Sequence, residues 1–81
     1  MKFLMIQKDK MVRAQDIIYL GVAPKMVKGK VKDELVQDGF QVRCNIEGGG
    51  VVLSERFENQ EEAFRLLLEI SDGKHFVSVP I

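Results

Sequence analysis

The sequence predicts an α+β domain, in which one principal helix accompanies an antiparallel sheet of five or six strands. Residues 40–46 and 75–81 alternate apolar and polar side chains, as strands with one buried face do. Residues 60–70 instead repeat their apolar side chains with the helical period. We therefore expect a strongly bent sheet, or a small barrel closed by the helix, with the helix before the last strand.

The helix has clear start and stop signals. Asn59 is the expected N-cap, and Glu62 three residues later completes a capping box. Gly73 follows the last apolar residue, Ile70, and suits the left-handed conformation that ends many helices. These signals predict a helix from Gln60 to Ile70 or Ser71.

The apolar face of this helix is wider than contact with one sheet requires. At 100° per residue its apolar side chains cover an arc of roughly 200°. Phe64 and Leu68 lie on one flank of that arc, so we expect them to need a second cover. Residues 74–81 of the same chain or a second subunit could supply it.

Shorter runs predict the other strands. Gly48, Gly49 and Gly50 form a hairpin connection after residues 40–46, and Pro80 suits an edge strand because it cannot donate to a ladder. The run that begins at Ile17 is expected to end at Ala23-Pro24. The further strands are expected at residues 2–6, 11–14, 17–22 and 51–57.

Residues 25–38 are the least regular part of the sequence. We expect an irregular basic loop that runs into an acidic turn. A short helix near residues 30–37 is the alternative, because Val27, Val31 and Leu35 recur at helical spacing and Gly39 could cap it.

Length and composition predict one small domain over residues 1–81. A chain of this size buries about 60–65% of its unfolded surface, so self-association would add useful stability. The single cysteine excludes an internal disulfide. Because we find no secretory leader and no apolar run long enough for a membrane span, we expect a cytoplasmic protein.

The net charge of zero conceals two halves of opposite sign. Residues 1–32 carry eight basic and two acidic side chains, whereas residues 33–81 carry four basic and ten acidic ones. This polarity could steer a polyanion or join two copies. Pairing of the two halves in a sheet would instead cancel most of it.

The sequence offers little for catalysis. Cys44 and His75 are the only candidates for a thiol and base pair, and Cys44 lies at an apolar position of its strand. One imidazole without cysteines or clustered carboxylates makes no metal site. The glycines at 48–50 lack the Lys-Ser/Thr of a phosphate loop. We expect no enzyme, no cofactor and no metal.

Four lysines within residues 25–32 are the only candidate for nucleic-acid contact. Ammonium groups can neutralise phosphates without regard to base sequence. A solvated surface loop is the simpler interpretation, because no arginine accompanies them. The four residues are Lys25, Lys28, Lys30 and Lys32.

Residues 57–63 read Phe-Glu-Asn-Gln-Glu-Glu-Ala and follow a strand-rich N-terminal part. This order resembles small uncharacterised bacterial and phage proteins that end in a strand, Phe-x-x-x-Glu-Glu-Ala and a short helix. The resemblance covers residues 1–70 and implies no activity. We expect a non-enzymatic binding or accessory module that self-associates, as a homodimer, through Phe64 and Leu68; the alternative is a sequence-independent nucleic-acid-binding module.

Overall fold

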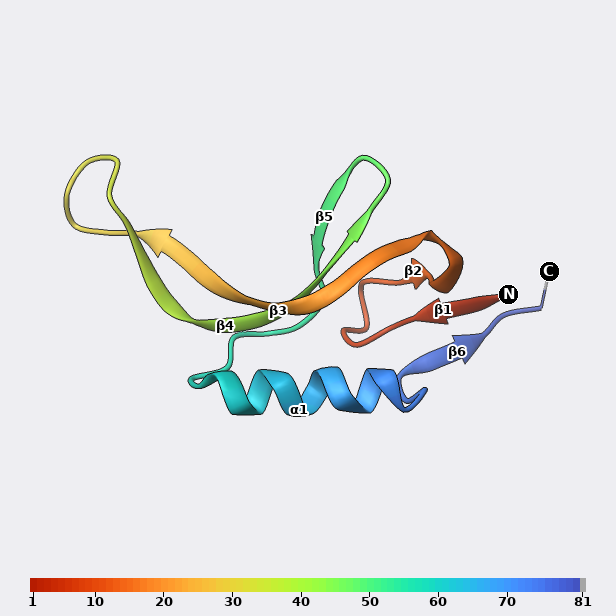
Figure 1. Ribbon diagram of the computed structural model, residues 1–81. Helices are drawn as coiled ribbons and strands as arrows, with labels where there is room; N and C mark the ends of the chain where they lie inside the picture. Colours follow the sequence, from red (N-terminus) through yellow and green to blue (C-terminus); the bar gives the residue numbers. More distant parts are fainter. Residues whose placement is uncertain (81) are drawn as a thin grey trace.

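A computed structural model describes residues 1–80, which form one α-helix and two three-stranded antiparallel sheets (Figure 1). The predicted α+β class and the predicted number of strands are confirmed. The strands are divided between two open sheets, each with two edge strands.

The first sheet joins the two ends of the chain. β1 (Lys2–Leu4) lies between β2 (Val12–Arg13) and β6 (Phe76–Ser78), so β6 is the edge strand that the sequence predicts. Main-chain hydrogen bonds between Met1 and Val79, at 2.8 and 3.0 Å, extend this pairing beyond β6. Residue 81 of the predicted last strand lies outside the described residues.

The second sheet has the order β3-β4-β5 and contains the two longest strands, β3 (Ile17–Lys28) and β4 (Leu35–Ile46). A 3₁₀ helix, η1 (Ala14–Asp16), precedes β3. The glycine hairpin leads into β5 (Gly49–Val52), and Gly48 and Gly49 take positive φ angles of 98° and 151°. The hairpin prediction is therefore confirmed, although β5 ends before the predicted residue 57.

The predictions for residues 25–38 are wrong. β3 and β4 continue past the body of the protein as a two-stranded arm, defined here as residues 24–40, and only residues 29–34 form its end loop (Figure 1). Met26 pairs with Gln37, and Val27 pairs with Val36. Val27 and Val36 are β-branched, which favours a strand over a helix. Because they pair across the ladder, this segment forms neither a helix nor a long irregular loop.

Pro24 does not end β3, contrary to the prediction, because its position faces the open edge of the sheet. Its partner Phe40 directs its own N–H and C=O toward Phe57, with both hydrogen bonds at 2.8 Å. Pro24 and Phe40 therefore do not bond to each other, and the imino nitrogen of Pro24 lies where no ladder donor is needed.

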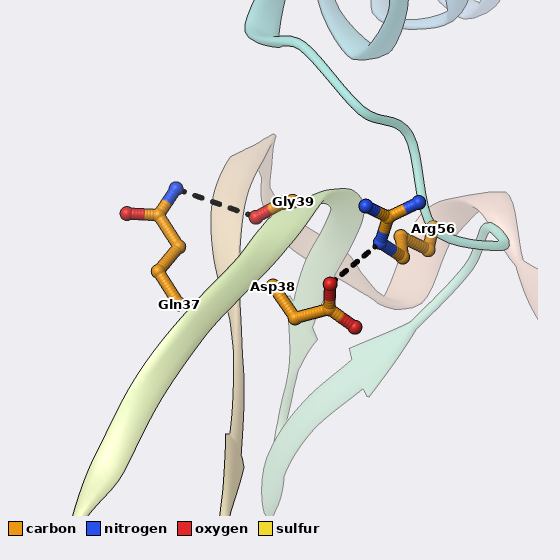
Figure 2. Close-up of polar contacts among 4 residues, drawn as sticks. All are labelled: Gln37, Asp38, Gly39 and Arg56. Carbon is orange, nitrogen blue, oxygen red and sulfur yellow. Dashed lines mark hydrogen bonds and ion pairs between the residues drawn. The ribbon is translucent and has the colours of Figure 1, made fainter. Parts of the chain in front are cut away.

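The base of the arm is fixed by a bulge at Asp38 and Gly39 (Figure 2). Gly39 takes a φ of +81°, and a Cβ there would clash with the carbonyl oxygen of Phe57. Arg56 donates to Asp38 at 2.9 Å, and the side chain of Gln37 donates to the Gly39 carbonyl at 3.4 Å. The Arg56–Asp38 contact ties the arm to the segment that precedes the helix, whereas the Gln37–Gly39 hydrogen bond lies within the arm.

The core lies between the helix and the inner faces of the two sheets. α1 (Gln60–Ser71) packs against β3 and β4. The alternation predicted for residues 40–46 holds, with Val42 and Cys44 fully buried. The buried apolar residues are Leu4, Val12, Val42, Cys44, Leu53, Ala63, Leu66 and Ile70.

Candidate interaction face

The ends of α1 agree with the sequence signals. The Asn59 side-chain oxygen accepts from the Glu62 amide at 2.9 Å, and the Asn59 side-chain nitrogen donates to the Glu62 carboxylate at 3.0 Å. The helix ends at Ser71, and Gly73 takes a φ of +88° while its amide donates to the Ile70 carbonyl at 2.9 Å. The structure thus places α1 between the predicted N-cap and the predicted C-terminal glycine.

One flank of this helix has no cover. Ala63, Leu66 and Ile70 are buried, whereas Phe64 and Leu68 remain 50% and 51% exposed. The C-terminal segment does not bury them, because β6 pairs with β1 in the other sheet. Residues 74–80 therefore do not cover Phe64 or Leu68. The other cover that the sequence suggests is a second subunit.

A groove of about 480 Å³ lies beside this flank. β3 forms one wall and the N-terminal half of α1 forms the other, and no residue of β4 lines it. Tyr19 at its rim is 62% exposed. The lining residues are Tyr19, Leu20, Gly21, Val22, Asn59, Gln60, Glu61, Phe64 and Leu67.

The wall formed by β3 is an open strand edge. In β4, Val42 accepts from Leu53 and its amide donates to the Ser54 hydroxyl, so its main chain faces β5. Its partner in β3, Val22, must then direct N–H and C=O to the open side, and Leu20 does the same. No strand, turn or side chain within residues 1–80 bonds to these groups. We call this surface, made of Tyr19, Phe64, Leu68 and the edges of Leu20 and Val22, the α1–β3 face.

The sequence predicted Phe64 and Leu68 in this face but not the residues of β3. The order of strands in a sheet depends on contacts between distant segments, so the open edge of β3 has no local signature. Tyr19 is adjacent to Ile18, which is 73% exposed. Two neighbouring exposed apolar residues in a strand are consistent with an uncovered surface, but such pairs also occur in bulges, as here.

The four candidate lysines lie together on the arm. Lys25 and Lys28 belong to β3, and Lys30 and Lys32 belong to the end loop. Three carboxylates occupy the same arm, from Asp33, Glu34 and Asp38. Strand pairing thus mixes the basic and acidic halves of the sequence here, which weakens the polarity seen in the charge count.

Cys44 and His75 do not form a thiol and base pair. Burial raises the pKa of the Cys44 thiol, which keeps the sulfur protonated and a weak nucleophile. The Nε2 atom of His75 lies 3.7 Å from Glu69 on α1. No hydrogen bond or ion pair within residues 1–80 joins the cysteine to the histidine.

The described residues contain no cluster of three or more potential metal ligands. None of their helices has the length and apolar character needed to cross a membrane. The sequence matches no family model, and no curated protein or solved structure is significantly similar to it.

Proposed function

We propose that this protein is a small non-enzymatic binding module that self-associates through the α1–β3 face. The half exposure of Phe64 and Leu68 is the observation that carries the proposal. Every other apolar residue of α1 packs into the body of the domain, with Leu67 partly buried against the core. An apolar flank beside an apolar groove is typical of a surface that meets another protein.

The size of the core supports the same proposal. Eight apolar residues are buried among residues 1–80, and most of the strand pairing there belongs to the extended β3–β4 pair. A domain of this length has marginal stability by itself. Association that buries two more large side chains per copy would stabilise the fold by mass action.

Analytical ultracentrifugation at tens of micromolar tests this proposal. We expect the protein to sediment as a dimer and the double variant Phe64→Gln/Leu68→Gln to sediment as a monomer with an unchanged circular dichroism spectrum. Arg65→Gln, on the exposed face of the same helix, is the matched control and should remain dimeric. A protein that is monomeric at these concentrations would refute self-association.

The alternative function is sequence-independent binding of nucleic acid by the arm. It is favoured by the projection of the arm from the body (Figure 1). The side chains of Lys28, Lys30 and Lys32 on the arm are also exposed. A two-stranded ribbon of this kind fits the major groove of DNA. The neighbouring carboxylates oppose it, so it ranks below self-association.

Binding of generic DNA and RNA as a function of salt tests the alternative. Replacement of all four arm lysines by glutamine should weaken binding uniformly across sequences. The slope of log K against log salt should fall by up to about 0.9 for each phosphate that the variant no longer neutralises. Absence of binding at about 50 mM salt removes this function.

A further inference from the structure

The apolar side of α1 extends beyond the edge of the sheet that the helix covers. α1 packs on β4 and on β3, which is the edge strand of its sheet. Phe64 and Leu67 line the groove on the side of β3 away from β4. The uncovered flank of α1 therefore lies where one more strand, paired with β3, would pass beneath it.

The open edge of β3 can accept a strand over a limited stretch. A bulge at Ile18 interrupts the regular ladder on one side. On the other side Pro24 has no N–H to donate. Between them Leu20 and Val22 each direct one N–H and one C=O outward. An added strand can thus form regular hydrogen bonds along residues 19–23.

This stretch lacks the usual features that protect a strand edge. Lysines, prolines and inward-pointing charges keep edge strands from pairing with another chain. From Ile17 to Ala23 β3 carries no charged residue, and Lys25 is the first one. A second copy of the same stretch can therefore approach it without repulsion between like charges.

The same stretch is complementary to itself about Gly21. In an antiparallel pair centred there, Leu20 lies opposite Val22 of the second chain, and all four outward N–H groups find a C=O. A pair centred on Leu20 would place Val22 opposite Ile18 of the second chain, where the bulge interrupts the ladder. A pair centred on Val22 would place Leu20 opposite Pro24, which has no N–H to donate. Only the Gly21 register satisfies every outward group of Leu20 and Val22.

The side chains around Gly21 suit this register. Gly21 lies beneath the ring of Tyr19, since a Cβ there would be 2.6 Å from the Tyr19 hydroxyl. Two tyrosines would then meet over the central glycines on the outer face. On the inner face, Phe64 of each helix, which lines the groove, would lie over the added strand and gain the second cover that it needs.

We infer that a second copy of this chain supplies the added strand, and that the two β3 strands pair antiparallel about a two-fold axis at Gly21. This inference rests on the proposed self-association and specifies its geometry. Tyr19 and Phe64 each expose about 100 Å² of a large side chain, or about 400 Å² for two copies. The two strand edges and the groove walls add to this area, and a specific interface buries roughly 1,000 Å² or more in total.

Val22→Pro tests the strand pairing. The N–H of Val22 faces the open edge, so proline removes a donor from the interface and none from the β3–β4 ladder. Val22→Ala is the matched control, because it loses side-chain volume and keeps the N–H. Sedimentation should show dimerisation weakened at least about tenfold for Val22→Pro relative to Val22→Ala, because each dimer loses two hydrogen bonds. Equal dimerisation of two folded variants would overturn the inference.

Disulfide trapping tests the register. Tyr19 should lie opposite the second copy's Ala23 as a non-hydrogen-bonded pair, whose Cα atoms approach to about 4.5 Å, within reach of a disulfide. Mixed Tyr19→Cys and Ala23→Cys proteins should form a cross-linked dimer under oxidation, while neither variant alone should do so. The native protein is the control, since its Cys44 is buried.

The outcomes separate the two proposals. A monomeric native protein refutes both self-association and strand pairing. A dimer that is disrupted by Phe64→Gln/Leu68→Gln, but gives no cross-link from the cysteine mixture, retains the interaction face and refutes the β3 register.

Discussion

Removal of the Ser54 hydroxyl should destabilise the fold more than its small size suggests. Ser54 is 2% exposed, and its oxygen accepts from the Val42 amide at 2.8 Å where β5 has already ended. The hydroxyl also donates to the Glu55 carbonyl at 3.0 Å. The Ser54 hydroxyl thus takes the place of a main-chain carbonyl as the hydrogen-bond acceptor for Val42, a fully buried residue of β4.

Ser54→Ala leaves the Val42 N–H buried without a partner. Such a group costs about 1–3 kcal/mol of the free energy of unfolding. For a domain of this size each kcal/mol lowers Tm by about 4–8 °C. Urea unfolding monitored by circular dichroism measures the difference directly, and the m-value should stay constant because the exposed surface hardly changes.

Ser78→Ala is the control, since this serine is exposed in β6, and it should change the free energy of unfolding by less than about 0.5 kcal/mol. If Ser54→Ala falls within the same range, the hydroxyl does not complete the ladder and the reasoning fails.

Three further predictions concern stability. Asn59→Ala should lower the free energy of unfolding by about 0.5–2 kcal/mol, and Asn59→Ser should restore most of it; equal melting of the two variants would exclude the cap. Gly39→Ala should lower it by at least about 1–3 kcal/mol, because a Cβ is strained at φ +81° and meets the Phe57 carbonyl; an unchanged Tm would refute the bulge. Burial raises the pKa of the Cys44 thiol, so its stabilising contribution is complete below the ordinary thiol pKa and is lost as pH rises through the raised value. The free energy of unfolding, measured with urea, should therefore fall more steeply with rising alkaline pH for the native protein than for Cys44→Ala. Parallel pH profiles of the two proteins would contradict this.

The helix was predictable because its determinants are local. The Asn59 cap, Glu62 and Gly73 act within one turn of the residues they stabilise, and the structure places α1 at Gln60–Ser71. The exposed flank followed from the same periodicity. The helical periodicity shows that the apolar arc is wider than an average sheet would cover. In the structure the sheet ends at β3, which leaves the flank of the helix exposed.

The arm was not predictable from the same kind of signal. Pro24, Lys25 and Lys28 disfavour a central strand, and they are tolerated because β3 is an edge. Whether a strand is central or at an edge depends on the order of strands, which no short window contains. For that reason the sequence also did not reveal the division into two sheets or the groove beside Tyr19.

The pairing of β1 with β6 has a consequence for the order of folding. It joins residues near 3 and 77, whereas β3 and β4 meet across the short loop at residues 29–34. Closure of a longer loop costs more chain entropy, and distant contacts form more slowly than local ones. We expect the β3–β4 hairpin to form early and the first sheet to assemble last. The open edge of β3 would then exist before the domain is complete, which leaves it available to a second chain during folding.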